Sequence, residues 1–146
     1  MSPSNSGNDG AMTLDFSQLA NAIARLDEIV SLYDRDPGNE VVRDALIQRF
    51  EFTYDLAHKS LRRALGAAAA SPEEIEHMTF PTLIRTADEQ ALLTSDWTVW
   101  HRFREMRNIT SHTYDQTKAM EVARDVAAFL DEVRPLPDRL RALESR

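Results

Sequence analysis

The longest helical pattern in this chain is NEVVRDALIQRFEFTYDLAHKSLRRALG, residues 39–66. Its apolar side chains recur every three or four residues, which places them on one face of an α-helix. These side chains are Val42, Leu46, Phe50, Tyr54, Ala57, Leu61 and either Ala64 or Leu65. Asn39 suits the N-cap position, and Gly66 with the alanines after it marks the end. The segment therefore predicts one long amphipathic helix.

Two further segments carry the same period on either side of it. The first has Asp15 or Ser17 as its cap and ends at residues 36–38. Its apolar residues, spaced 4, 3, 4 and 3, are Leu19, Ile23, Leu26, Val30 and Tyr33. The last begins at Asp115 or Thr117 and is expected to stop or kink near Arg134, because Pro135 and Pro137 lack a backbone donor. Its apolar residues are Ala119, Val122, Val126, Phe129 and Val133. We expect residues 138–146 to add no more than a short frayed turn.

The middle of the chain predicts shorter helices. Ser71, Pro72 and Glu74 fit a capping box that starts one helical turn ending near Met78. A helix after Phe80 is expected to carry Leu83, Ile84, Ala87 and Ala91. Residues 94–96 then cap a helix in which Trp100 and Phe103, with Met106 or Arg107, share one face. No alternating strand pattern occurs. The sequence predicts an all-α protein, an antiparallel four-helix bundle with a short extra helix.

Length and composition limit the remaining possibilities. The chain has 146 residues, enough for one domain with its own core, which we place at residues 13–146 after a disordered tail of residues 1–12. It contains 24 acidic and 17 basic residues, so any RNA contact requires a local basic patch. The lack of cysteine suits a cytoplasmic location, and no apolar run is long enough for a membrane span.

The polar stretch RNITSHTY, residues 107–114, separates the third main helix from the last. Arg107 is followed by His112 five residues later and by Tyr114 two residues beyond that. Alone, this pattern also fits a polar helix end with an ordinary surface histidine. The apolar face that precedes it, however, fixes its place against the core.

This stretch resembles the Arg-x4-His-x-Tyr signature of the HEPN superfamily. A second segment, residues 49–61, is similar to "RFEFTxELAxKxL" of the group called nucleotidyltransferase substrate-binding proteins, which act as toxins paired with minimal nucleotidyltransferase (MNT) antitoxins. The resemblance covers about residues 14–133. It departs at His58, where the group usually has an aromatic residue, most often tryptophan, and that departure bears on packing more than on chemistry. The resemblance implies the HEPN-like helical bundle and a homodimer that shares its motifs at one interface.

The residue types suit cleavage of RNA without a metal. The ribose 2′-hydroxyl attacks the adjacent phosphorus and the 5′-oxygen leaves. His112 can move protons near neutral pH, and Arg107 can stabilise charge on the phosphoryl oxygens. Asn108 could orient the phosphate or the imidazole, and Glu51 lies inside the family-like segment. The other charges of that helix fit a solvated face on which Asp55 attracts Lys59.

The spacing of Arg107 and His112 raises a geometric question. Five residues on a straight helix rotate by about 140°, so the two side chains would diverge. Either the helix breaks between Asn108 and Ser111, or a second chain completes the site. His101, Arg102, Arg104 and Arg107, doubled across a dimer, could supply the local positive patch, although not all four can face one way.

Neither a metal site nor a nucleotide-binding loop is predicted. The four histidines show no paired ligand spacing, and the four glycines form no phosphate-binding loop. We therefore expect no metal and no cofactor.

Three functions remain. The first is a metal-independent endoribonuclease toxin of a type VII-like MNT–HEPN pair, acting on an RNA such as tRNA or mRNA. The resemblance implies that the antitoxin silences it by transferring AMP from ATP to Tyr114. The second is a non-catalytic substrate-binding subunit of a minimal nucleotidyltransferase. The third is a dimerisation module without activity. The presence of Arg107, His112 and Tyr114 together favours the first.

Overall fold

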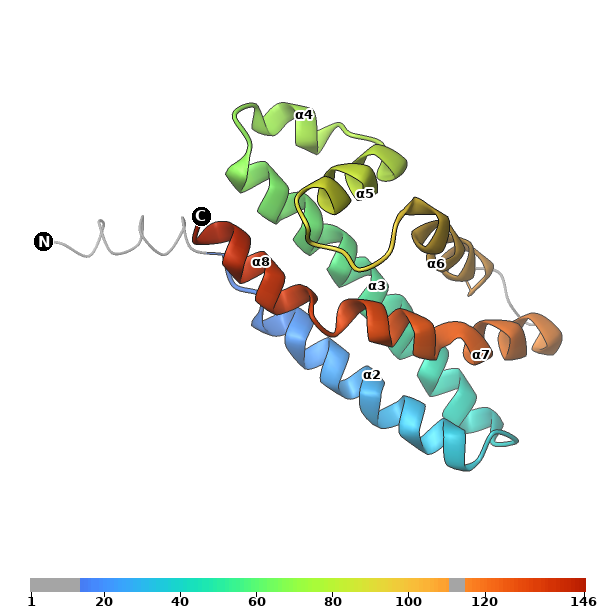
Figure 1. Ribbon diagram of the computed structural model, residues 1–146. Coiled ribbons are helices and arrows are strands. Elements are labelled where there is room, and N and C mark those ends of the chain that lie inside the picture. The colour runs from blue at the N-terminus through green and yellow to red at the C-terminus, as the bar shows by residue number, and fades with distance from the viewer. Residues whose placement is uncertain (1–13, 111–114) are drawn as a thin grey trace, which may run out of the picture.

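The computed structural model describes residues 14–110 and 115–146 as a stack of helices (Figure 1). The predicted tail and residues 111–114 lie outside this described part. Its helices are α2 (Ser17–Arg35), α3 (Glu40–Ala68), α4 (Pro72–Glu76), α5 (Phe80–Glu89), α6 (Trp97–Thr110), α7 (Gln116–Val133) and α8 (Leu136–Glu144). No strand occurs in the described ranges. The prediction of an all-α bundle is confirmed.

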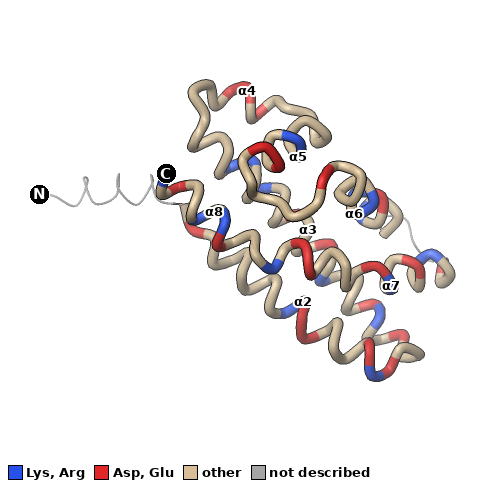
Figure 2. The backbone as a smooth tube through the Cα atoms, in the orientation of Figure 1, with Lys and Arg blue, Asp and Glu red and all other residues tan. Residues whose placement is uncertain are grey.

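α3 is the central helix of the bundle. α2 lies antiparallel along its first half, and α7 crosses both of them (Figure 1). α4, α5 and α6 pack along the other side of α3. Acidic residues occur on all these helices, and basic residues on all of them except α4 (Figure 2).

The predicted caps at three helix starts are present. The Asn39 side chain accepts hydrogen bonds from the amides of Val41 and Val42, and Asp115 accepts from those of Thr117 and Lys118. At the start of α6, Asp96 accepts from the Thr98 amide at 3.0 Å. Each carboxylate or amide oxygen satisfies a backbone donor that the first helical turn leaves unpaired.

Three local predictions were wrong. The Ser71 side chain makes no capping hydrogen bond, although Pro72 does begin α4. α5 ends at Glu89, and Ala91 lies beyond it with a positive φ of 62°. The segment predicted to fray forms α8, whose Leu136, Leu140 and Leu143 are buried in the core.

Aromatic rings hold α6 in position. Phe50 of α3, Phe103 of α6 and Phe129 of α7 are essentially fully buried. The Phe129 ring lies 5.0 Å from that of Phe50 and 5.2 Å from that of Phe103, both edge to face. Trp100 packs against Phe103 at 5.3 Å. This cluster sets the rotation of α6 about its axis, and therefore which of its later side chains face α3.

A buried glutamate joins the α5–α6 connection to α7. Glu132 is 6% exposed, and its Oε2 accepts hydrogen bonds from the amides of Thr94 and Ser95 at 2.9 and 3.1 Å. The indole Nε1 of Trp100 donates to the same oxygen at 3.3 Å. This carboxylate satisfies three donors at the point where the chain turns into α6.

We expect Glu132→Ala to lower the free energy of unfolding by about 3 kcal/mol, because it leaves these donors without an acceptor in a buried place. Glu132→Gln keeps one acceptor oxygen and should cost about 1 kcal/mol. Urea denaturation followed by circular dichroism measures both. Glu121→Ala, an exposed position on the same helix, is the control, and an equal loss there would contradict the assigned role.

Candidate functional site

Arg107 lies in the last turn of α6 and faces α3. Its neighbours Phe103 and Met106 are buried, so the guanidinium is carried against the surface of the central helix. There it meets Glu51 and Asp55, which are four residues apart and therefore lie on one face of α3. Arg107 Nε and Nη2 donate to the two oxygens of Asp55 at 3.1 and 3.2 Å, and Nη1 donates to Glu51 Oε2 at 2.8 Å.

The two carboxylates of this cluster stabilise the protonated form of Arg107. The hydrogen bond to Asp55 is the main cause that raises the pKa of Arg107, and the charges of Asp55 and Glu51 add to it against the cost of burial. The Arg107 and Glu51 side chains are 26% and 27% exposed, whereas Asp55 is 48% exposed. The cluster is thus more open to solvent on the Asp55 side, and an incoming anion would compete with Asp55 for the guanidinium.

Thr110 extends the same network. Its hydroxyl lies 2.9 Å from Glu51 Oε2 and 2.8 Å from the Arg107 carbonyl oxygen, two acceptors between which its single proton is shared. α6 therefore remains helical through Thr110, so no break occurs between Asn108 and Thr110. The part of the proposed break at Ser111 lies outside the described residues.

The predicted site residues are only partly placed. Arg107 and Glu51 are in direct contact, and Asn108 is exposed on α6. His112 and Tyr114 lie outside the described residues, so their distances from Arg107 are not part of the description.

Asp55 is the residue that the sequence interpretation missed. The sequence predicts a solvated face on which Lys59 is the partner of Asp55, and this prediction is wrong, because Arg107, 52 residues away, binds the carboxylate. Its spacing of four from Glu51 was the available signal.

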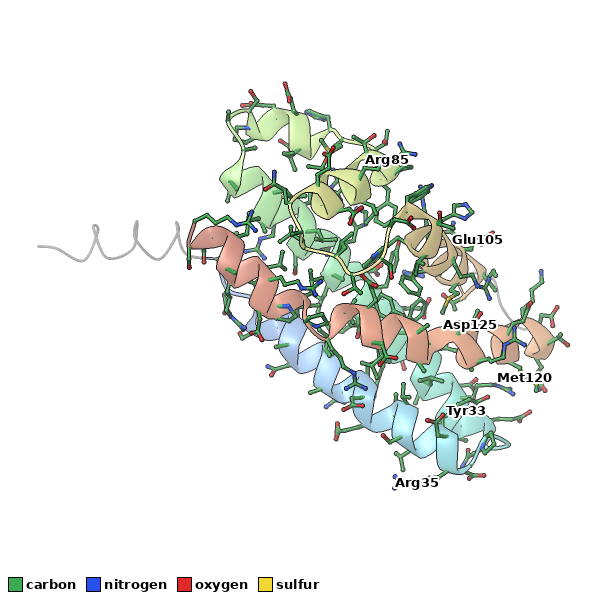
Figure 3. All side chains as sticks on the ribbon, in the orientation of Figure 1. Tyr33, Arg35, Arg85, Glu105, Met120 and Asp125 are labelled. Atoms are coloured by element: carbon green, nitrogen blue, oxygen red, sulfur yellow. The ribbon has the colours of Figure 1, made fainter. Side chains whose placement is uncertain are left out.

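The basic residues of α6 point in different directions. Arg102 forms an ion pair with Asp125 of α7 at 2.7 Å, while Arg104 lies over the Phe80 ring at 5.3 Å. His101 lies 3.8 Å from Glu105, which projects outward from α6 (Figure 3). The patch that one chain presents near Arg107 is therefore smaller than the number of basic residues suggests.

His58 belongs to an aromatic contact on the other side of Asp55. Its ring lies 4.6 Å from Phe80 and 6.4 Å from Tyr54, so it fills the aromatic place expected here. Arg62 Nη2 lies 3.1 Å from His58 Nε2. Since arginine can only donate, Nε2 accepts and the ring proton lies on Nδ1. Burial and then the charge of Arg62 lower the pKa of His58.

The lowered pKa of His58 predicts how the stability of the fold depends on pH. The unfolded chain takes up a proton at His58 near pH 6.5, whereas the folded chain does so at lower pH, so stability falls as the pH drops below about 7. His58→Phe should therefore cost less stability at pH 5.5 than at pH 7.5. Urea midpoints at the two pH values measure the difference. An identical cost at both would mean that folding leaves the pKa of His58 unchanged.

No group of three His, Asp or Glu side chains in residues 14–110 and 115–146 could hold a metal ion. Across the same ranges, none of the helices is long and apolar enough to cross a membrane.

Comparison with known proteins gives consistent results. Residues 14–142 match the family model described as nucleotidyltransferase substrate binding protein like. The chain is 39% identical over 120 residues to the Haemophilus influenzae protein named "Probable ribonuclease HepT", covering 77% of this chain and 82% of that protein. It also resembles the solved structure of HI0074 from Haemophilus influenzae, described as the fold of a substrate binding domain of a nucleotidyltransferase. That similarity has a TM-score of 0.80 and 35% identity, and covers 87% of this chain and 99% of the other. The chain therefore belongs to the nucleotidyltransferase substrate-binding protein family and is a HepT-like member of it.

Proposed function

We propose that this protein is a metal-independent endoribonuclease toxin whose cognate MNT nucleotidyltransferase silences it. The observation that carries the proposal is Arg107, a guanidinium oriented by Glu51 and Asp55 and placed directly before the segment with His112 and Tyr114. The name of the Haemophilus influenzae relative supports a ribonuclease. The family description supports a nucleotidyltransferase as the partner.

The proposed reaction cleaves the bond between phosphorus and the 5′-oxygen of RNA. A base takes the proton of the 2′-hydroxyl as its oxygen attacks phosphorus, and an acid protonates the departing 5′-oxygen. The products are a 2′,3′-cyclic phosphate and a free 5′-hydroxyl. Arg107 donates hydrogen bonds to the phosphoryl oxygens, and His112 supplies proton transfer. Asn108, exposed one residue after Arg107, can donate to the same phosphate.

The direct test is cleavage of single-stranded RNA by unmodified protein in excess EDTA. We expect a 5′-hydroxyl and a cyclic phosphate at the new ends, and no cleavage when the RNA carries a 2′-deoxy substitution at the cut site. Cleavage that requires an added metal ion, or a product with a 5′-phosphate, would contradict the mechanism.

A non-catalytic substrate-binding subunit is the second candidate. The family description and the HI0074 structure favour it, since both refer to substrate binding for a nucleotidyltransferase. Protein that binds the nucleotidyltransferase but leaves every RNA intact would support this role instead.

Proton balance argues for a homodimer. One histidine can act at a given moment as base or as acid, whereas the reaction uses both, and two chains would bring two copies of His112. We therefore propose a dimer in which the region from Trp100 to Tyr114 is shared. We expect light scattering to give twice the chain mass at micromolar concentrations. A monomer at all concentrations, alone and with the partner, would contradict this assembly.

A further inference from the structure

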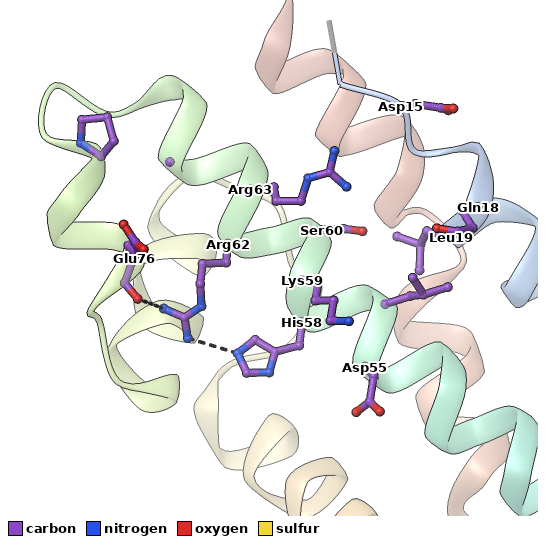
Figure 4. A pocket seen from close by; sticks show the side chains of 13 residues that line it. Asp15, Gln18, Leu19, Asp55, His58, Lys59, Ser60, Arg62, Arg63 and Glu76 are labelled. Atoms are coloured by element: carbon purple, nitrogen blue, oxygen red, sulfur yellow. Dashed lines mark hydrogen bonds between the residues drawn. The ribbon is translucent and has the colours of Figure 1, made fainter. Parts of the chain in front are cut away.

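A cavity of about 660 Å³ opens along α3, beginning at Asp55 (Figure 4). We call it the α3 pocket, and its boundary comes from α3, the start of α2 and α4. Its volume lies within the range of about 300–1,000 Å³ found for small-molecule sites. Asp55 belongs to both the pocket and the Arg107 cluster, so the two sites are continuous.

The lining combines apolar and polar groups. Leu56 contributes apolar surface, whereas Leu19 borders the pocket but is only 1% exposed. Ser60 is 7% exposed and makes no hydrogen bond to another described residue. Its hydroxyl is therefore available to a ligand. His58 is held with its proton on Nδ1 by Arg62, which gives the pocket a donor that does not depend on protonation near neutral pH.

Three basic side chains line the pocket, Lys59, Arg62 and Arg63, and one of them stabilises the fold. Arg62 Nη1 donates to the carbonyl oxygens of Ile75 and Met78 at 2.7 and 2.9 Å, which ties α4 to α3. This arginine satisfies carbonyls at the end of a short helix and forms the wall of the pocket, so we do not assign it to a ligand.

The other two cations, Lys59 and Arg63, remain for an anion. They are exposed, lie four residues apart on one face of α3, and form no ion pair with any other described residue. The carboxylates of the lining are Asp15, Asp55 and Glu76. Asp55 is paired with Arg107, which it shares with Glu51, and Asp15 accepts from the Ser17 amide at 2.8 Å, while Glu76 lies on α4.

We propose that the α3 pocket binds the nucleotide that flanks the cleaved bond of the RNA substrate. Lys59 and Arg63 contact its phosphate, and the base packs on Leu56 with polar edges toward Ser60 and His58. This inference rests on the proposed ribonuclease function and extends it, because it gives the RNA strand a path away from Arg107. A free nucleoside monophosphate carries the same phosphate and base, and the experiment below distinguishes it from a nucleotide within RNA.

The test measures binding of a fluorescent 12-nucleotide RNA by anisotropy, in a His112→Ala background so that the RNA stays intact. We expect Lys59→Gln combined with Arg63→Gln to weaken binding at least tenfold. The slope of log affinity against log salt should fall by about 0.7, since the two cations contact one phosphate and each neutralised phosphate on a single strand contributes about 0.7. Both substituted side chains are exposed, so the melting temperature should not change.

The matched control is Arg35→Gln combined with Arg85→Gln, which makes the same change in net charge. Arg35 lies at the end of α2 and Arg85 projects from α5 (Figure 3), and neither residue lines the pocket. The control should change affinity less than twofold, because exposed charges beyond about 10 Å are screened in physiological salt. An equal loss in both pairs would mean general attraction to RNA and would overturn the subsite.

Other outcomes also decide. Unchanged RNA affinity in the pocket variant overturns the proposal. If AMP nevertheless competes for the pocket, the pocket belongs to a free nucleotide. If the pocket variant instead no longer binds the nucleotidyltransferase partner, the pocket belongs to protein docking. If the wild-type protein neither binds nor cleaves RNA, the proposed function itself fails. If it does both and the pocket variant is unaffected, only the subsite fails.

Discussion

Arg107→Ala and His112→Ala should each lower the rate of RNA cleavage by at least about a hundredfold. Removing a positioned acid or base costs about 10²–10⁴ in rate. Removing a donor that stabilises developing charge costs about 10²–10³, and Arg107 would also help to bind the phosphate. Because the two groups serve the same transition state, the double variant should be little slower than either single variant. Single-turnover cleavage of labelled RNA measures the three rates.

The controls must separate chemistry from folding. Arg107→Ala leaves Glu51 and Asp55, four residues apart on α3, without their shared cation, so we expect a loss of roughly 0.5–1 kcal/mol in stability. Arg107→Lys keeps the charge but cannot bind both oxygens of Asp55, so its stability should change less while cleavage still falls sharply. Cleavage that persists in His112→Ala would remove histidine from the mechanism.

Helix positions were the part of this fold that the sequence predicted well. The spacing of apolar residues in α2, α3 and α7 can be read from each segment alone. Asn39 and Asp115 cap their helices through hydrogen bonds to amides two and three residues away. α8 was missed because Pro135 and Pro137 were interpreted as a stop. Proline is also accepted in the first turn of a helix, where its missing donor costs nothing. Leu136 and Leu140, four residues apart, are both buried, so this segment belongs to the core.

Contacts between distant segments could not be predicted in the same way. Asp55 has Lys59 as a local candidate partner, and only the packing of α6 against α3 brings Arg107 to it. Glu132 shows the same difficulty, because its three donors lie 32 to 38 residues away. In each case an aromatic cluster fixes the helix orientation first, and the polar contact follows from it.

Tyr114→Phe should prevent covalent silencing by the nucleotidyltransferase. In the proposed modification the phenolic oxygen attacks the α-phosphorus of ATP, pyrophosphate leaves, and the phenolic proton is released. The resulting phosphodiester is an anion attached two residues from His112, where it would occupy the phosphate position and compete for Arg107. Phenylalanine keeps the ring and deletes the acceptor oxygen, so the variant should fold normally. After co-expression with an active partner and its removal, we expect this variant to retain RNA cleavage while the wild-type protein has lost it.

The other two tyrosines provide the comparison for this test. Tyr54 is 5% exposed, and burial raises its pKa to about 12, so its hydroxyl is a poor acceptor for AMP. Tyr33 is half-buried at the end of α2, and Tyr33→Phe is the matched variant that should still gain AMP and lose cleavage. Intact-mass and peptide mass spectrometry identify the modified residue and the number of AMP units. If the wild-type protein is inhibited while Tyr114 remains unmodified, the bound partner inhibits it by masking the site. Cleavage should then return when the partner is removed.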